Sequence, residues 1–107
     1  MRTISADDFE FKMVIGTSLS GYVKTTYNQL LSVLGEPTCP EPSGDNKVQK
    51  EWVVKYKGNY YTVYDWKTYD VNYTVNELDT FHVGSKCYAS DFISELQNKI
   101  ESLTKKK

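Results

Sequence analysis

The stretch KVQKEWVVKYKGNYYTVYDW, residues 47–66, decides the fold of this chain. Residues Lys47–Tyr56 alternate between apolar and polar side chains, which is the pattern of a strand with one buried face. Lys57-Gly58-Asn59 has turn-forming residue types, and Tyr60–Trp66 is again rich in β-branched and aromatic residues. The stretch therefore predicts a β-hairpin. The expected buried face of its first strand consists of Val48, Trp52, Val54 and Tyr56.

Toward the N-terminus, the pattern predicts a further strand followed by a loop. Phe9–Ile15 alternates and then becomes apolar, so we expect a strand there, preceded by a frayed segment at residues 1–8. Residues 16–21, Gly-Thr-Ser-Leu-Ser-Gly, are expected to form a loop. Residues 36–46 contain all three prolines of the chain, so they predict an irregular segment that is too short to link two domains.

A helix is predicted between these two irregular segments. Thr26 and Gln29 have the spacing of a capping box, in which the hydroxyl and the amide each satisfy a backbone N–H at the helix start. The alternative is a start nearer Ser20. Gly35 suits the position after the last helical residue, and Pro37 prevents continuation. The expected apolar face consists of Leu30, Leu31, Val33 and Leu34.

After the hairpin, the chain predicts a short strand and a second helix. Residues 69–79 either extend the hairpin or form a long loop, whereas Thr80–Val83 is expected to be a strand that ends at Gly84-Ser85-Lys86. Ser90 is a suitable N-cap for a helix that frays at residues 104–107. The apolar stripe of this helix consists of Phe92, Ile93, Leu96, Ile100 and Leu103.

Together these elements predict a single α+β domain over residues 1–107. Their order is β-α-β-β-(β)-α, which gives a small antiparallel sheet of about three to four strands with two helices packed on one face. A bare edge of the hairpin could pair with a second copy of the chain, so a homodimer is one expected oligomeric state.

Charge and composition exclude several classes of function. The chain has 13 basic and 14 acidic residues and a formal net charge of −1, whereas binding to duplex DNA needs a clear basic excess. No apolar run approaches the ~18 residues of a membrane span, and the first residues lack the pattern of a signal peptide. We therefore expect a soluble intracellular protein that binds neither duplex DNA nor a membrane, with Cys39 and Cys87 as free thiols and Cys39 exposed.

The hairpin is unusually rich in tyrosine, which makes it the expected binding site. Because neighbouring residues of a strand point to opposite faces, only about half of its rings can enter the core. The others form either an ordinary solvated surface with cross-strand aromatic pairs or a face that binds a partner. We expect a face that binds a protein, or a small ligand, rather than a polynucleotide. The candidate anchors are Tyr60, Tyr64, Trp66 and Tyr69.

Two glycine-containing segments precede the expected helices and could hold an anion on their backbone N–H groups. A Walker loop is excluded, because Tyr22-Val23 follows Gly21 where Lys-Ser/Thr is required. The alternative for both segments is an ordinary strand-to-helix turn. The candidate anion-binding residues are Gly16, Thr17, Gly21 and Lys24 in the first segment, and Gly84, Ser85 and Lys86 in the second.

An enzyme would have to be built around His82, the one histidine of the chain. This residue could act as a general base together with Asp65 or Asp79. Nothing in the spacing selects either pair, and no CxxC or HxxxH pattern indicates a metal site. We therefore assign no catalytic residue, no metal ligand and no cofactor, and we expect a protein that is not an enzyme.

Six short segments of the chain resemble those of a group of small uncharacterised accessory proteins of tailed bacteriophages. The segments are Gly16–Leu19, Gly21–Val23, Leu34–Pro37, Glu51-Trp52, Thr62–Lys67 and His82–Gly84, and the likeness spans residues 13–100. The chain departs from the pattern of the group at Lys57, Phe81 and Ser85, where Asp, Trp and Gly are common.

The resemblance implies an accessory protein that acts in the cytoplasm of an infected bacterium and is not part of the virion. A protein of this kind would bind a host protein or a defence protein, and the aromatic hairpin is the expected contact. The alternative that the resemblance implies is sequestration of a nucleotide or a nucleotide-derived signal, for which the two glycine-containing segments are the expected site.

Overall fold

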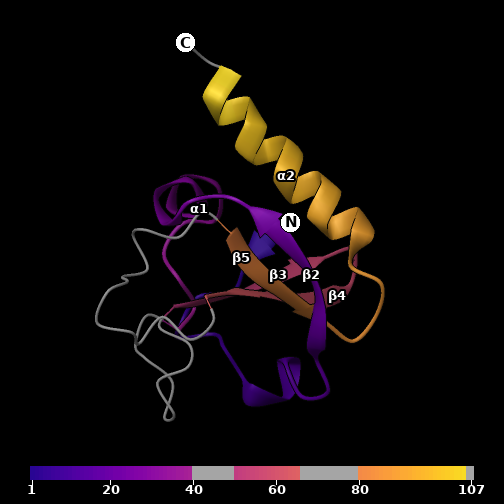
Figure 1. Cartoon of the computed structure of the whole chain (residues 1–107). Coiled ribbons are helices and arrows are strands. Elements are labelled where there is room, and N and C mark those ends of the chain that lie inside the picture. Colours follow the sequence, from indigo (N-terminus) through magenta and orange to yellow (C-terminus); the bar gives the residue numbers. More distant parts are fainter. Residues whose placement is uncertain (40–49, 66–79, 106–107) are drawn as a thin grey trace, which may run out of the picture.

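A computed structural model of the chain describes residues 1–39, 50–65 and 80–105. Within these ranges an antiparallel sheet carries two α-helices, which confirms the expected α+β class (Figure 1). The described sheet has five strands, in the order β1-β3-β4-β5-β2, and is therefore larger than expected. The elements are β1 (Arg2–Thr3), the 3-10 helix η1 (Phe11–Met13), β2 (Ser18–Lys24), α1 (Tyr27–Leu34), β3 (Glu51–Tyr56), β4 (Asn59–Tyr64), β5 (Thr80–Ser85) and α2 (Ser90–Lys105).

The predicted hairpin is confirmed as β3 and β4. Tyr56 pairs with Asn59, so the loop between the strands consists of Lys57 and Gly58 alone. Both loop residues have positive φ angles, 50° and 82°, which is the conformation of a tight turn that matches the twist of two antiparallel strands. Because the turn sets the register of the hairpin, it also decides which residues of both strands face the core.

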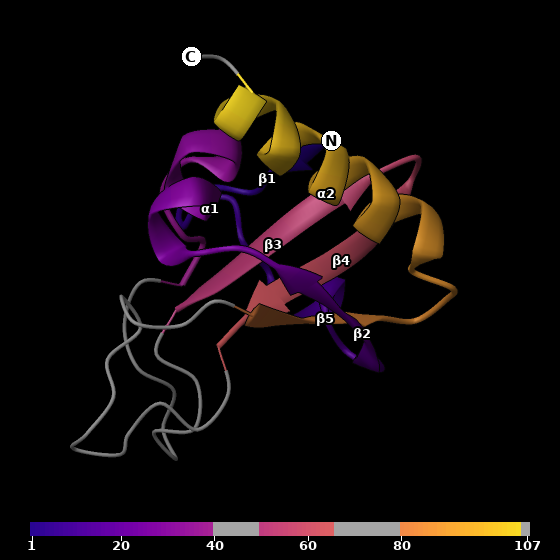
Figure 2. The ribbon, with the colours of Figure 1, turned by 45° about the horizontal axis from the view of Figure 1, so that its top comes forward.

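Both α-helices lie on the same face of the sheet, as expected (Figure 2). α1 begins at the predicted capping box: the Gln29 N–H donates to the Thr26 hydroxyl, and the Thr26 N–H donates to the side-chain oxygen of Gln29. The alternative start near Ser20 is wrong, because Ser20 belongs to β2. In the described ranges, neither α-helix is long and apolar enough to cross a membrane.

The buried core fills the space between the two helices and the sheet. Trp52 and Val54, expected on the buried face of β3, are part of it, and Tyr56 packs against it; Val48 lies outside the described residues. The ring of Tyr61 stacks on that of Phe92, with 4.4 Å between centroids. The core consists of Val23, Leu30, Leu34, Trp52, Val54, Tyr61, Val63, Phe81, Val83, Ala89, Phe92, Leu96 and Ile100.

The N-terminal segment is part of the sheet, so the expected fraying does not apply to residues 2–4. β1 pairs with β3, and the Ile4 N–H donates to the carbonyl oxygen of Val53 at 2.8 Å. The Thr38 hydroxyl donates to the Ile4 carbonyl at 2.6 Å and accepts from the Val53 N–H at 2.9 Å. β3 is thus covered on its outer edge, and β4 pairs with β5, so the expected bare edge of the hairpin is wrong.

The segment Phe9–Ile15 and the start of α2 differ from the prediction. Phe9–Ile15 contains η1 and turns where a strand was expected; its alternation covers only a few residues, and no described strand pairs with it. α2 begins at Ser90 itself, which was expected to be the N-cap. The Ala89 carbonyl accepts the first helical hydrogen bond, from the Ile93 N–H, at 2.8 Å.

The two glycine-containing segments lie mostly in strands. β2 begins within the expected loop at residues 16–21, and β5 continues through Gly84 to Ser85. The physical reason is space: a Cβ on Gly21 would lie 2.6 Å from Cδ1 of Ile93, and a Cβ on Gly84 would lie 2.6 Å from Oγ1 of Thr62. These glycines therefore serve close packing within and above the sheet, a use that local sequence does not distinguish from a chain reversal.

Candidate functional site

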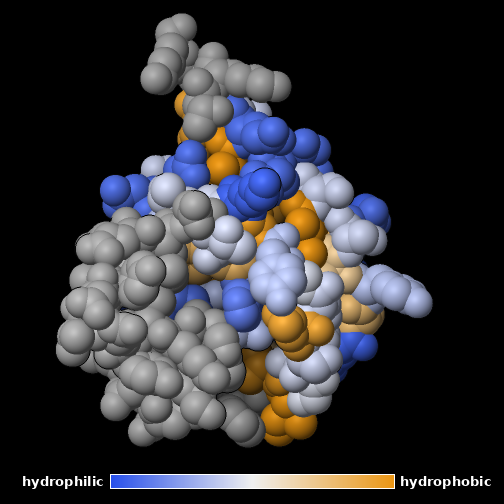
Figure 3. All heavy atoms as spheres, in the orientation of Figure 1, coloured by the Kyte–Doolittle hydropathy of each residue, from blue (hydrophilic) through white to orange (hydrophobic). Residues whose placement is uncertain are grey.

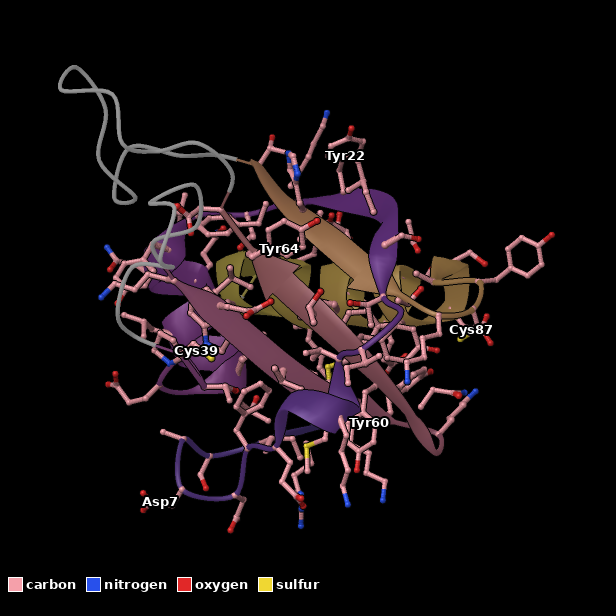
Figure 4. The ribbon with its side chains drawn as sticks, turned by 90° about the horizontal axis from the view of Figure 1, so that it is seen from below. Asp7, Tyr22, Cys39, Tyr60, Tyr64 and Cys87 are labelled. Carbon is pink, nitrogen blue, oxygen red and sulfur yellow. The ribbon has the colours of Figure 1, made fainter. Side chains whose placement is uncertain are left out.

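A row of four side chains crosses the face of the sheet that is turned away from the helices. Glu51 of β3 pairs with Tyr64 of β4, Tyr64 pairs with His82 of β5, and His82 pairs with Tyr22 of β2. Directly paired residues point to the same face, so the register places all four side chains in one line. Figure 4 views this face, with Tyr64 between Cys39 on one side and Tyr22 on the other.

The aromatic members of this row contact one another edge to face. The ring centroids of Tyr22 and His82 are 5.0 Å apart at an interplanar angle of 87°, and those of Tyr64 and His82 are 5.6 Å apart at 65°. Edge-to-face geometry is favourable for aromatic pairs because it brings the positive ring edge against the negative ring face. The three rings therefore form one continuous surface across β4, β5 and β2.

The most exposed apolar side chains near this row belong to residues 15–22. Ile15, Leu19 and Tyr22 are 54%, 50% and 55% exposed. We call these three residues the β2 surface. Hydrophobic side chains gather over β2 and beneath its start in Figure 3. Exposed apolar groups that gather in one region are typical of interaction sites.

The predicted anchors lie only partly at this place. Tyr64 belongs to the row and is half-buried, whereas Tyr60 is half-buried toward the hairpin turn, where the Lys55 ammonium lies 5.9 Å from its ring centroid. Trp66 and Tyr69 lie outside the described residues. Sequence reasoning missed the β2 surface because it expected a strand that ends at Ile15, a loop at Leu19 and no strand at Tyr22. The alternation Leu19, Gly21, Val23 was the available signal, and a β-bulge between Leu19 and Gly21 interrupts it.

Burial shifts the titration of the groups along the row. The pKa of Glu51 is raised by burial and further by the nearby charge of Asp65. Burial, followed by the charges of Glu51 and Tyr22, raises the pKa of Tyr64. The pKa of His82 is lowered by burial, an effect that Asp65 opposes. Burial therefore favours the neutral imidazole, which has one donor and one acceptor nitrogen.

The residues proposed for an enzyme are partly brought together. The effect of Asp65 on the pKa of His82 shows that the two side chains lie close enough to interact, and Asp79 is outside the described residues. Asp65 is fully buried and accepts the Lys50 N–H at 2.7 Å. A buried carboxylate that bonds to backbone next to a half-buried histidine is also a structural arrangement, so the geometry assigns no catalytic role to the pair.

Replacing Glu51 with glutamine is expected to stabilise the protein at pH 7 and to leave its stability unchanged near pH 4. A carboxyl with a raised pKa in the folded state stabilises the fold fully below its ordinary pKa, 4.5, and loses that contribution as pH rises through the folded value. Glutamine carries no charge, so the variant does not lose this contribution to stability as the pH rises. Thermal unfolding at both pH values measures the difference.

The exposed Glu95 provides the matched control for this measurement, because Glu95→Gln removes the same charge without burial. We expect no pH-dependent gain from the control. If Glu51→Gln changed the melting temperature equally at pH 4 and pH 7, desolvation of this carboxyl would be refuted as the cause.

A second feature lies at the start of α2, where the two predicted anion-binding segments meet. An open pocket of about 610 Å³ is lined by Ser18, Ser20, Ser85, Lys86, Cys87, Tyr88 and Ala89. The hydroxyl oxygens of Ser20 and Ser85 are 2.9 Å apart, and the Ser85 hydroxyl donates to the Cys87 carbonyl. Residues from both segments are therefore side by side, although they are far apart in the sequence.

Only part of the predicted anion-binding set lines this pocket. Ser85 and Lys86 line it, and the Lys86 side chain passes close to Gly16. Thr17 closes a turn by donating both its N–H and its hydroxyl to Val14. Gly21, Lys24 and Gly84 lie in strands and are not among the lining residues, so these two glycines do not belong to loops at helix starts as expected.

Neither cysteine is part of a disulfide. Cys39 is half-buried where exposure was expected, because it pairs with Glu51 at the sheet edge, and the pKa of its thiol is raised by burial and by Glu51. Cys87 is exposed, and its sulfur lies 3.6 Å from the Tyr61 hydroxyl; burial and this contact raise the pKa of Tyr61 to about 12. Across the described ranges, no group of three His, Cys, Asp or Glu side chains is arranged to hold a metal ion.

The chain was compared with protein-family models, with curated proteins and with solved structures. None of the three comparisons returned a match. The sheet face and the pocket are therefore the features from which we infer a function.

Proposed function

We propose that this chain is a non-enzymatic accessory protein that binds a partner protein through the β2 surface, with Tyr64 and His82 beside it. The observation that supports the proposal is the exposure of Ile15, Leu19 and Tyr22 within one short segment. Exposure of such side chains to water is unfavourable, and burying one of them against a partner stabilises the complex by on the order of 1–2 kcal/mol. The partner we propose is a host or defence protein in the cytoplasm of an infected bacterium.

The chemistry of this face favours a protein over a nucleic acid. The β2 surface consists of two aliphatic side chains and one aromatic side chain, and the chain as a whole carries a net charge of −1. Nucleic acid binding depends on clustered Lys and Arg that neutralise phosphates, whereas the centres of protein interfaces are rich in aromatic residues and poor in charge. Tyr22 is suited to be an anchor because its ring buries a large area and keeps a polar hydroxyl.

Leu19→Ala and Tyr22→Ala are each expected to weaken partner binding by about tenfold or more, as removal of a central interface anchor does. The partner is captured on the immobilised chain from a bacterial lysate, identified by mass, purified, and titrated calorimetrically against each variant. Leu103→Ala is the matched control, because Leu103 is an exposed leucine on α2, away from this face.

The predicted hairpin anchor provides the contrasting result. If Tyr60→Ala abolished binding while Leu19→Ala and Tyr22→Ala left the affinity unchanged, the partner would contact the hairpin turn, and the β2 surface would be refuted as the site. Each variant is compared only after its melting temperature shows that it is folded. Nucleotide binding stays a prediction, and it is an outcome of the experiment described next.

A further inference from the structure

β2 is an edge strand in the described sheet, and part of its outer side is already paired by a side chain. It has β5 as a neighbour on one side only. At its end, the Lys24 N–H donates to Oε1 of Gln97 at 3.1 Å, and Nε2 of Gln97 donates to the Lys24 carbonyl at 2.9 Å. The amide of Gln97 thus takes the place that a neighbouring strand would take. The Ser18 carbonyl accepts from the Ser20 hydroxyl, and among the described residues no side chain bonds to the backbone of Tyr22.

Tyr22 presents its backbone to this open side. In an antiparallel ladder the backbone groups of successive residues point alternately to one neighbour and to the other. Lys24 points outward to Gln97, so the N–H and carbonyl of Tyr22, two residues earlier, point outward as well. No described residue bonds to either group. An added strand would therefore find one donor and one acceptor at Tyr22, which is what recognition by strand addition requires.

The pocket at the start of α2 borders the same strand. Ser18 and Ser20 of β2 line it, and they precede Tyr22 by two to four residues. Because a strand advances about 3.3 Å per residue, a bound segment of about six residues spans both the pocket and Tyr22. Alternate side chains of such a segment point to opposite faces. One set would contact Leu19 and the ring of Tyr22, and the other would enter the pocket.

The lining of the pocket indicates which side chain it accepts. Lys86 is the one charged residue among the described residues that line it, and the Ser18 hydroxyl adds a donor, whereas the Ser20 hydroxyl donates to the Ser18 carbonyl. A carboxylate matches an ammonium and a hydroxyl donor, since charge-assisted hydrogen bonds are the stronger ones. The remaining lining, Tyr88 and Ala89, suits the aliphatic part of such a side chain.

We propose that the partner binds as an extended peptide segment added to the outer edge of β2 beside residues 18–22, with a carboxylate in the pocket next to Lys86. The carboxylate is either an Asp or Glu side chain or the C-terminus of the segment. This inference rests on the proposed function, because it assumes that the β2 surface binds a protein, and it adds how that protein is recognised.

A second copy of this chain fits the same edge less well. Pairing β2 with its copy about a two-fold axis would use the outer groups of both Lys24 residues, which Gln97 already occupies. The bulge between Leu19 and Gly21 also breaks the register that two long strands would need. A peptide that pairs only beside residues 18–22 leaves the Lys24 groups to Gln97, and a short segment has fewer residues to keep in register across the bulge.

The test uses the full chain and two random dodecapeptide libraries, one with free C-termini and one with C-terminal amides. Tyr22→Pro removes the outward N–H and leaves the pairing with β5 intact, because proline is tolerated where an edge strand faces solvent. Tyr22→Ala is the matched control, since it removes the same ring and keeps the N–H. We expect enriched peptides with a carboxylate, bound about tenfold more weakly by Tyr22→Pro than by Tyr22→Ala.

Lys86→Ala is expected to weaken the same peptides by about tenfold, and Lys57→Ala, an exposed lysine outside the pocket, is expected to leave them unchanged. Enrichment from the free-terminus library alone identifies the terminal carboxylate, and enrichment from both identifies a side chain. Hydrogen exchange at the Tyr22 amide of the wild-type chain gives a measurement that does not depend on a variant. A bound peptide should slow this exchange about tenfold or more.

Strand addition would be overturned if no peptide were enriched, or if Tyr22→Pro and Tyr22→Ala bound the peptides equally and hydrogen exchange at the Tyr22 amide were not slowed. A dimer of the chain that Tyr22→Pro dissociates would also overturn it. So would thermal stabilisation by ATP or cyclic dinucleotides that Lys86→Ala removes while no peptide binds. The proposed function is tested separately from strand addition. If no peptide were enriched but the affinity of a captured partner still depended on the Leu19 and Tyr22 side chains, the proposed function would stand and strand addition would not.

Discussion

Trp52→Ala is expected to lower the free energy of unfolding by about 3–5 kcal/mol. The side chain is fully buried, and its ring lies 5.8 Å from that of Tyr27 and 6.0 Å from that of Phe81, measured between centroids. Its Nε1–H also donates at 2.9 Å to the carbonyl of Gly35, the residue that ends α1. Alanine would leave a cavity where α1, β3 and β5 meet. Since small domains have about 5–15 kcal/mol in total, this loss brings the fold close to its limit.

Urea unfolding followed by far-UV circular dichroism measures this change. Trp52→Phe keeps most of the apolar volume and removes the hydrogen bond to Gly35, so it is expected to cost about 1–2 kcal/mol. Tyr88→Ala is the surface control: the side chain is 94% exposed, and its removal should change stability by less than about 0.5 kcal/mol. An alanine variant at position 52 that was as stable as the wild type would refute the assigned core.

Gly84→Ala is expected to cost about 1–3 kcal/mol, although alanine has the higher intrinsic preference for a strand. The added Cβ would lie 2.6 Å from Oγ1 of Thr62, 3.3 Å from the carbonyl oxygen of Ser18 and 3.5 Å from Cε1 of Tyr64. Thr62 is a buried β-branched residue, and the Ser18 atom belongs to the backbone, so neither can move away without a loss of stability. The substitution should also displace the Tyr64 ring from the row.

A double substitution separates this steric cause from others. Thr62→Ala removes the atom that the new Cβ would meet, so the two changes together should cost less than the sum of the single costs. Gly58→Ala is the contrasting glycine variant. It has open space around its Cβ and φ of 82°, so its cost of about 1 kcal/mol is conformational and Thr62→Ala should not alter it. Strict additivity of Gly84→Ala and Thr62→Ala would contradict the predicted contact.

The elements that depend on neighbouring residues could be predicted from the sequence. The hairpin follows from alternation and from the turn at Lys57-Gly58, and α1 follows from the capping box between Thr26 and Gln29. In each case the interacting groups are only a few residues apart. The apolar periodicity of α2 likewise predicted its buried stripe, because a helix repeats its faces whatever it packs against.

The candidate site could be predicted only in part. Alternation indicated that Tyr60 and Tyr64 share a face, and the structure places both on the face away from the helices. It did not indicate that Tyr22 completes the row, since β2 was expected to be a loop and a helix start. Gly21 and Gly84 were expected in loops, but they lie in strands where there is no room for a Cβ. The local sequence does not distinguish a glycine that permits close packing from one that permits a turn.

Local side-chain patterns were enough to predict the class of the fold, the hairpin with its turn, the two helices and the face on which they pack. These follow from side-chain periodicity and from hydrogen bonds between near neighbours. The tertiary structure alone decided that β2 pairs with β5, which brings Ser20 within hydrogen-bonding distance of Ser85, 65 residues away, and Tyr22 against His82. That pairing depends on contacts between distant segments and on the space that two glycines leave, and a local sequence pattern predicts neither of these. The tyrosine row, the pocket and the open edge of β2 all result from it.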